Sequence, residues 1–164
     1  MMPGWFDIFD WPLGVGCKND EDGLKRSVDT VKSCVKDLEK KGVEKSRIII
    51  GGFSQGGAVA LRSVYHDEDD DGVYAACVNL SGWLTFDKTN EKNDSTPLFW
   101  GHGSFDDKVL FEQQAYGVHK LAEIGVTNVK DESYKVGHSS HPMELVAFAN
   151  FVKETLDGGA SGEL

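Results

Sequence analysis

Residues 52–56, Gly-Phe-Ser-Gln-Gly, form the pattern G-x-S-x-G. The pattern follows a short apolar run at 47–50, which we expect to be a strand, and it opens an expected helix at 55–65. A serine in such a strand-to-helix turn is typical of a nucleophile elbow, which lifts the Ser54 hydroxyl toward solvent and calls for glycine on both sides. The backbone N–H of Gln55 would then face a developing oxyanion. The alternative is a glycine-rich turn that carries its serine by chance.

A serine hydroxyl needs a base to accept its proton and an acid to orient that base. In chains with this elbow, the acid and then the base follow the serine in the sequence. Asp106 comes after an expected strand at 97–100, and His138 comes after one at 129–136. Both lie in loops beyond the carboxyl ends of strands, where ligand sites of α/β sheets are found. The alternatives are a helix cap for Asp106 or Asp107, and a loop histidine bonded to backbone for His138.

The rest of the chain alternates strand and helix patterns, which favours a mostly parallel sheet flanked by helices. The expected helices cover 22–41, 55–65, 109–124 and 142–156, and the expected strands cover 47–50, 73–80, 97–100 and 129–136. The length of 164 residues suits one domain. We expect that domain to cover 1–156 and a flexible tail to follow at 157–164.

Three of the expected helices carry apolar stripes that should face the sheet. In helix 22–41 the stripe consists of Leu24, Val28, Val31, Val35 and Leu38. In helix 109–124 it consists of Phe111, Ala115, Val118 and Ala122. In helix 142–156 it consists of Leu145, Phe148, Val152 and Leu156.

Composition narrows the range of partners. The net charge of −10 repels phosphate backbones and anionic lipid, which argues against nucleic acid and against stable membrane insertion. No apolar run approaches the ~20 residues that span a bilayer, and the first residues do not resemble a signal peptide.

The three cysteines, Cys17, Cys34 and Cys77, fit neither a disulfide framework nor a zinc motif, which favours the cytoplasm. We expect no cofactor and no metal, because the calcium-loop-like run at 67–72 has Val78 where such a loop needs glutamate.

Several segments resemble the acyl-protein thioesterases, within the phospholipase/carboxylesterase group of α/β-hydrolases. The most specific is R-I-I-I-G-G-F-S-Q-G-G-A at 47–58, and the others are W-F-D at 5–7, D-E-D-G at 20–23, S-G-W-L at 81–84, H-G-x-x-D at 102–106 and G-H-S at 137–139. The resemblance implies an α/β-hydrolase fold, with Ser54 as nucleophile, Asp106 as triad acid and His138 as base. It also implies substrates that are fatty acyl thioesters of proteins, such as a palmitoylated protein, lysophospholipids or simple carboxylic esters.

The resulting functional prediction is a serine hydrolase that cleaves carboxylic esters or thioesters through an acyl-enzyme. Members of the group also carry first strands and an H-G-x-G-D-like loop that supplies a second oxyanion N–H. The chain begins just before Trp5, after the place of that segment, so we expect an N-terminally shortened sheet and half of the oxyanion hole missing. The alternative is a catalytically impaired binding module on a hydrolase scaffold, or an incomplete fragment. A shortened sheet would leave 47–50 as an unprotected edge strand, through which we expect self-association.

An acyl group needs an apolar groove beside the serine. The candidates near the expected strand ends are Phe9, Trp11, Leu13, Trp83, Leu84 and Leu110. Core packing is the alternative for each of them, because large apolar side chains are mostly buried. The triad by itself does not separate a thioester from an oxyester, since a thiolate leaves with little help from an acid.

Overall fold

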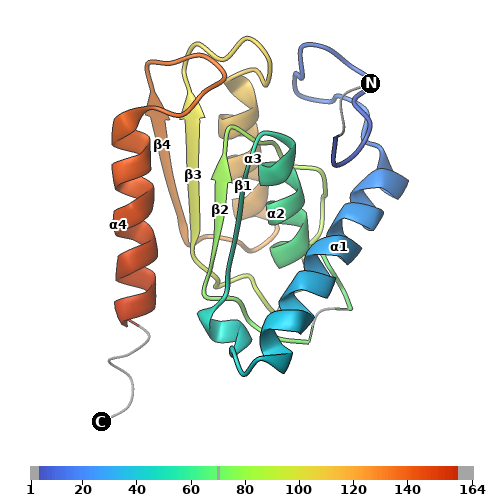
Figure 1. The fold of residues 1–164 in the computed structure, drawn as a ribbon. Helices are drawn as coiled ribbons and strands as arrows, with labels where there is room; N and C mark the ends of the chain where they lie inside the picture. The colour runs from blue at the N-terminus through green and yellow to red at the C-terminus, as the bar shows by residue number, and fades with distance from the viewer. Residues whose placement is uncertain (1–3, 70, 159–164) are drawn as a thin grey trace.

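The computed structural model describes residues 4–69 and 71–158. Figure 1 shows one parallel sheet, with the strand order β1-β2-β3-β4, between layers of helices. The strands are β1 (Ile49–Phe53), β2 (Ala76–Leu80), β3 (Leu98–Gly103) and β4 (Val129–Tyr134). The helices are α1 (Glu21–Lys40), α2 (Gln55–Tyr65), α3 (Glu112–Glu123) and α4 (Pro142–Gly158), and a short 3-10 helix, η1, covers Lys45–Arg47. The predicted α/β class is confirmed.

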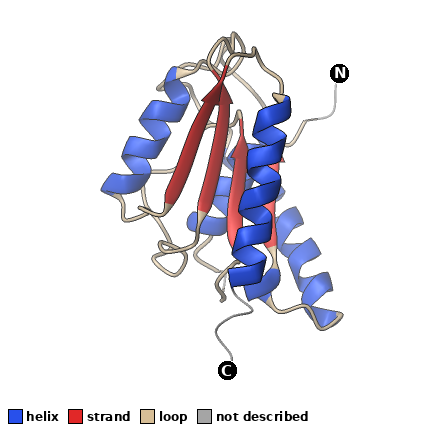
Figure 2. Cartoon of the chain, turned by 90° about the vertical axis from the view of Figure 1, so that its left-hand side faces the viewer, coloured by secondary structure: helices blue, strands red, loops and turns tan. Residues whose placement is uncertain are grey.

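Helix α4 covers one face of the sheet, and α1, α2 and α3 lie on the other side (Figure 2). Side chains of the central strands alternate between the two faces, as the two-residue period of a strand requires. Cys77 and Trp100 pack in the larger core cluster under the helices of the second face, whereas Val78 and Phe99 pack toward Phe151 of α4. All residues of β3 are buried, so this strand is the centre of the fold.

Helix α1 agrees closely with the predicted helix at 22–41. The Asp20 carboxylate caps its first turn by accepting the backbone N–H of Gly23 at 3.0 Å. Most of the predicted stripe is turned toward the core, but Leu38 in the last turn is 39% exposed. Gly42 follows with a φ of +87°, a left-handed conformation that ends the helix.

Strand β1 lies a few residues later than the predicted strand at 47–50. It includes Gly51 and Gly52, which lie beyond the predicted strand, since Gly51 pairs with Val78 and Gly52 pairs with Asn79. A Cβ on Gly51 would lie 3.0 Å from the Cβ of Val78, so a larger residue would press against β2. The strand lies at the edge of the sheet, as predicted.

The predicted buried face of the third helix is wrong. Helix α3 begins at Glu112 and turns another side toward the sheet. Val118 packs against the core, but the other predicted stripe residues, Phe111, Ala115 and Ala122, are exposed. The residues that the structure buries instead are Gln113, Gln114, Gly117 and Leu121.

One polar residue, Gln114, and one small residue, Gly117, explain why α3 turns this side toward the sheet. The Gln114 amide is buried because it donates to the carbonyls of Trp100 in β3 and Glu132 in β4, at 2.9 and 3.0 Å. Gly117 is buried because a Cβ there would lie 2.2 Å from Cη2 of the Trp100 ring. Hydrophobic spacing does not detect either interaction, since one uses hydrogen bonds to backbone and the other uses the absence of a side chain.

The predicted face of the last helix is correct in part, because Phe148 and Val152 of the predicted stripe pack against the core. Glu144 and Phe151 are the buried residues of α4, whereas Leu145 from the predicted stripe is 48% exposed. One Glu144 oxygen accepts the backbone N–H of His141 at 3.1 Å and so caps the helix. The other oxygen lies against Gly101 of β3, where a Cβ would be 2.2 Å from it, and it has no hydrogen-bond partner among the described residues.

Helix α4 continues to Gly158, so the first two residues of the predicted tail at 157–164 are helical. The rest of that tail lies outside the described residues. Within residues 4–69 and 71–158, no helix combines the length and the apolar character needed to cross a bilayer.

The acidic run at 67–72 forms ion pairs with basic side chains of neighbouring segments. Asp67 lies 2.8 Å from the Lys32 ammonium, and Asp71 lies 2.9 Å from that of Lys45. In the described part of the chain, no group of three or more His, Cys, Asp or Glu side chains is arranged to hold a metal ion.

We predict that Glu144→Gln stabilises the protein increasingly as the pH rises. Burial raises the pKa of Glu144 above its ordinary value of 4.5, so the folded state holds this proton more tightly than the unfolded state does. Relative to the Glu144→Gln variant, whose side chain never ionises, the unaltered protein therefore loses stability as the pH rises through the raised pKa of Glu144. Urea unfolding at pH 4.5 and at neutral pH measures the difference. The exposed Glu154→Gln on the same helix is the control, and an advantage of Glu144→Gln that shrinks toward neutral pH would contradict the prediction.

Candidate active site

The turn at Ser54 joins the end of β1 to the start of α2. Ser54 has a φ of 56° and a ψ of −119°, a conformation that strains any residue with a side chain. Its N–H donates to the Leu80 carbonyl at 2.8 Å, and its carbonyl accepts the N–H of Ala58 at 3.2 Å. These bonds hold the strained turn and present the hydroxyl at the carboxyl end of the sheet, as the elbow pattern predicts.

Glycine is needed on one side of this turn. A Cβ on Gly52 would lie 2.2 Å from the carbonyl carbon of Gly56, which leaves no room for another residue. Outside its own helix, a Cβ on Gly56 would meet the Trp5 indole nitrogen at 3.8 Å, an ordinary contact. The expectation that both flanking glycines are needed is therefore correct for Gly52 and wrong for Gly56.

His138 connects Ser54 to Asp106. Its Nε2 lies 2.9 Å from Ser54 Oγ, and its Nδ1 lies 2.7 Å from Asp106 Oδ2. The buried carboxylate accepts the Nδ1 hydrogen, so Nε2 is left to accept the serine proton. The Phe53 ring packs against the imidazole, with the ring centroids 4.8 Å apart. The structure thus brings together three side chains from separate loops in an arrangement that activates a hydroxyl.

Backbone contacts hold the loops of the acid and the base against each other. The Phe105 N–H donates to the Val136 carbonyl at 3.0 Å. Gly103 permits this approach, because a Cβ there would lie 2.2 Å from the carbonyl oxygen of Gly137. The two loops therefore continue the pairing of β3 with β4, and they place Asp106 next to His138.

Adjacent aspartates have opposite surroundings in this loop. Asp106 Oδ1 accepts the backbone N–H groups of Lys108 and Val109, each at 2.9 Å, and the side chain is fully buried. Asp107 is exposed and lies 3.3 Å from the Lys108 ammonium. The cap role considered for either residue is not found, because α3 has Phe111 as its N-cap without a side-chain hydrogen bond. Asp106 is the carboxylate that contacts His138.

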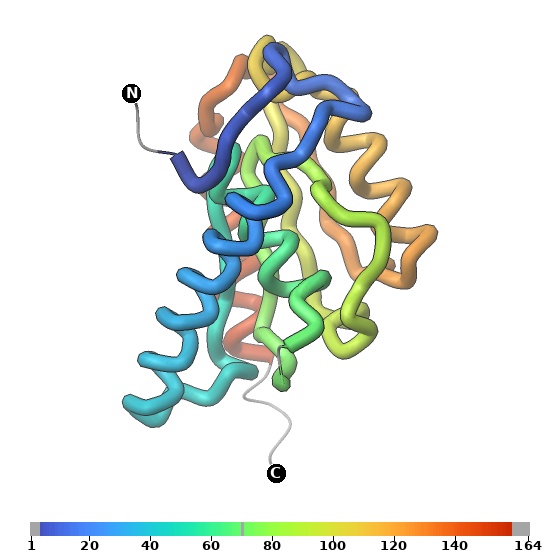
Figure 3. Tube along the Cα trace, turned by 90° about the vertical axis from the view of Figure 1, so that its right-hand side faces the viewer, coloured from blue at the N-terminus to red at the C-terminus, as the bar shows by residue number. Residues whose placement is uncertain are grey.

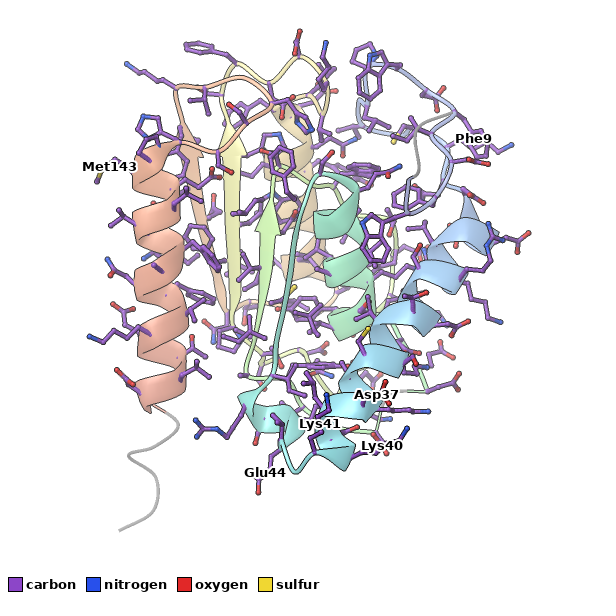
Figure 4. All side chains as sticks on the ribbon, in the orientation of Figure 1. Phe9, Asp37, Lys40, Lys41, Glu44 and Met143 are labelled. Atoms are coloured by element: carbon purple, nitrogen blue, oxygen red, sulfur yellow. The ribbon has the colours of Figure 1, made fainter. Side chains whose placement is uncertain are left out.

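An open cavity of about 750 Å³ lies beside Ser54. The N-terminal loop, residues 4–20, forms one wall, and Figure 3 shows it folded over the end of the molecule at which α1 and α2 begin. Figure 4 shows Phe9 on the outer side of this loop, and it shows Asp37, Lys40, Lys41 and Glu44 at the opposite end of the molecule. The apolar part of the lining consists of Trp5, Phe6, Ile8, Trp11 and Phe53.

The Gln55 side chain ties this wall to the elbow. Its Oε1 accepts the Trp5 N–H at 3.1 Å, and its Nε2 donates to the Phe6 carbonyl at 2.8 Å. At the other end of the loop, Asp20 accepts the Asp7 N–H at 2.9 Å in addition to capping α1, and these hydrogen bonds lower the pKa of Asp20. The wall is therefore positioned by the residue after the serine and by the start of α1.

The predicted groove residues are divided between the cavity and the core. Trp11 lines the cavity and is 60% exposed. Leu13 and Trp83 pack together in one core cluster, and Leu84 packs in another, so core packing is the correct alternative for these three. Leu110 is half-buried, and its N–H donates to the Leu13 carbonyl at 3.0 Å.

The remaining apolar lining was missed as a binding surface. Trp5 and Phe6 belong to the W-F-D segment, and Phe53 is the variable residue of the elbow. Their direction has no periodic signal in the sequence, because Trp5 and Phe6 lie in an irregular loop and Phe53 lies at a strand end.

Comparison with known sequences adds to this geometry. The profile of the family described as Phospholipase/Carboxylesterase matches residues 1–156. The chain belongs to this family. It is 37% identical to an acyl-protein thioesterase 1 of Debaryomyces hansenii, over 95% of this chain and 68% of that protein. It is 35% identical to one of Aspergillus fumigatus, over 99% of this chain and 73% of that protein. The resemblance inferred from the sequence is confirmed.

Solved structures of a carboxylesterase and an acyl-protein thioesterase share the fold. The crystal structure of Arabidopsis thaliana SOBER1 matches with a TM-score of 0.84 and 32% identity, covering 93% of this chain and 73% of that one. The structure of Zea mays acyl-protein thioesterase 2 matches with a TM-score of 0.73 and 27% identity, covering 93% and 72%. The α/β-hydrolase fold is therefore confirmed for this member of the family.

For this phospholipase/carboxylesterase family member, we predict that Asp106→Asn slows the reaction of Ser54 with a fluorophosphonate probe by on the order of 10⁴-fold. The amide favours the wrong imidazole tautomer at His138. Asp107→Asn should leave the rate unchanged, since Asp107 is exposed and pairs with Lys108. Second-order labelling rates, with Ser54→Ala as the blank, measure both effects. The opposite ranking of the two aspartates would contradict the assignment.

Proposed function

We propose that this chain is a serine hydrolase that cleaves carboxylic esters and thioesters through an acyl-enzyme on Ser54. The observation that carries the proposal is the hydrogen-bonded series from Ser54 through His138 to the buried Asp106, with distances of 2.9 and 2.7 Å. Relatives named acyl-protein thioesterase and carboxylesterase support the same class of reaction.

The proposed mechanism has two steps. His138 takes the proton of Ser54 as the hydroxyl attacks the carbonyl carbon, and it then protonates the leaving group. Asp106 holds the imidazole in the required tautomer and stabilises the imidazolium. The N–H of Gln55 binds the oxyanion, because the first N–H groups of a helix such as α2 have no intrahelical partner. In the second step, His138 activates the water that releases the acid, and the reaction as proposed uses no cofactor.

We propose that the cavity binds the acyl part of the substrate. Its apolar wall is open to solvent, with Trp5 48% exposed, Ile8 38% exposed and Phe53 41% exposed. Covering such surface with an acyl chain is favourable by about 25 cal/mol per Å² of apolar area. The named relatives favour a fatty acyl thioester of a protein, such as a palmitoylated protein, and a lysophospholipid or simple ester is the other acyl source to compare.

We also propose that the protein acts in the cytoplasm. Its three cysteines, Cys17, Cys34 and Cys77, are all free thiols in the structure. Thiols persist in reducing compartments, whereas oxidising compartments favour disulfides.

We predict that Ser54→Ala and His138→Ala each lower kcat by on the order of 10⁴–10⁶, because the triad acts as a unit. The substrates are p-nitrophenyl octanoate, a palmitoyl-cysteine peptide and a lysophospholipid. His141→Ala is the matched control and should keep most of the activity. The His141 ring stacks on Tyr134 with centroids 5.7 Å apart, and its Nδ1 accepts the Met143 N–H at the start of α4.

The outcomes of this experiment separate the two functional classes. Full activity in His138→Ala would overturn the proposed triad. The binding module would be favoured over the hydrolase if the unaltered chain bound acyl ligands but neither turned over any of the substrates nor reacted with the fluorophosphonate.

We further propose that the chain self-associates through β1. No strand pairs with the outer edge of β1 in the described part of the chain. Since Ser54 N–H points to Leu80 of β2, alternation along the strand directs the N–H groups of Ile49, Gly51 and Phe53 outward. Such an edge is a template for pairing with another strand.

We predict that these outward amides exchange rapidly at low protein concentration and become protected as the concentration rises. Amides that face β2, such as those of Ile50 and Gly52, should stay protected throughout and serve as the internal control. Sedimentation and hydrogen exchange, measured over the same concentrations, test this. A monomer at every concentration with protected Ile49 and Gly51 amides would contradict self-association.

A further inference from the structure

His102 is a buried histidine beside the proposed triad that the mechanism does not use. It lies near the end of β3, and its side chain is fully buried. Its Nε2 lies 2.9 Å from the Val109 carbonyl oxygen and 3.4 Å from Asp106 Oδ2. The Phe111 ring covers it at a centroid distance of 6.0 Å. The titratable groups that face it are Asp106 and His138.

The tautomer of His102 follows from its partners. A carbonyl oxygen only accepts, so Nε2 carries a hydrogen and donates it to Val109. Nδ1 is buried and has no hydrogen-bond partner among the described residues. Burial lowers the pKa of His102, which keeps the ring neutral and leaves Nδ1 without a hydrogen. The donor of the ring is therefore Nε2, on the side of Val109 and Asp106, and the buried Nδ1 is an acceptor.

His102 and Asp106 hold the same residue of the acid loop. The Val109 N–H donates to Asp106 Oδ1 at 2.9 Å, while the Val109 carbonyl accepts from His102. Val109 is itself fully buried and pairs with Leu13 of the cavity loop. His102 Nε2 also lies 3.4 Å from Oδ2, the oxygen that faces His138, while its hydrogen is donated to Val109.

We propose that His102 is a positioning residue for Asp106, through the donor at its Nε2 rather than through ring packing. By donating to the Val109 carbonyl, the ring fixes the backbone segment whose N–H binds Oδ1, so that Asp106 keeps the orientation in which Oδ2 meets His138. The inference rests on the proposed hydrolase function for its kinetic consequence, but its structural consequence does not depend on turnover.

The two amide variants of His102 separate the donor from the packing. His102→Gln can place its amide nitrogen where Nε2 lies, whereas His102→Asn reaches only the region of Nδ1. We expect His102→Asn to lower kcat by about 10- to 100-fold with KM within twofold, since a small misplacement of a triad member has an effect of this size. We expect His102→Gln to stay within about threefold of the unaltered enzyme. Melting temperatures identify any loss due to unfolding.

A second readout uses no activity. In a Ser54→Ala background, the hydrogen that His138 Nδ1 donates to Asp106 should give a low-field proton NMR signal. We expect the signal to persist in His102→Gln and to move upfield or vanish in His102→Asn at equal folded fraction. Equal kcat values for the two variants, or identical proton signals, would overturn the proposal. If the unaltered chain proves inactive, the hydrolase proposal fails while the NMR comparison still decides the role of His102.

Discussion

The close approach of Gly52 to Gly56 is the constraint on which the whole site depends. Since a Cβ on Gly52 would lie 2.2 Å from Gly56, strand β1 and helix α2 meet at an angle that no larger residue permits. The resulting turn holds Ser54 at a φ of 56° and makes Gln55 the first residue of the helix. From that position the Gln55 side chain binds the loop that walls the cavity. One steric contact thus positions the hydroxyl, the helix N-terminus and the nearest wall.

The carboxylate and the imidazole depend on a second close approach, between Gly103 and the carbonyl of Gly137. Through it, the parallel register of β3 and β4 continues into the two loops, so the register sets the distance from Asp106 to His138. Burial makes an ionised carboxylate costly unless donors surround it. Backbone N–H groups and the imidazole provide these donors at Asp106, so the carboxylate that meets His138 is part of the buried fold.

Sequence patterns predicted the limits of the helices well where local signals determine them. The limits of α2 agree with the predicted 55–65, and those of α1 lie within one residue of the prediction at each end, because helical spacing and caps are local signals. The buried face of α3 was predicted wrongly, and that of α4 was predicted correctly only in part. Gln114 is buried because it bonds to the backbone of β3 and β4, and Glu144 is buried while it caps its own helix. A hydrophobicity pattern assigns such residues to the surface.

The sequence by itself determined the order of strands and helices, the elbow at Ser54 and the set of side chains able to act with it, because steric demands and chain order are local properties. Only the tertiary structure decided which of two neighbouring loop residues belongs to the site. Asp106 is buried against His138 while Asp107 is exposed, and Trp11 lines the cavity while Leu13 joins the core. The physical reason is that the loop after β3 and the N-terminal loop are bound to each other at Leu13 and Val109. In an irregular segment, side-chain directions follow from such long-range contacts, and no period in the sequence encodes them.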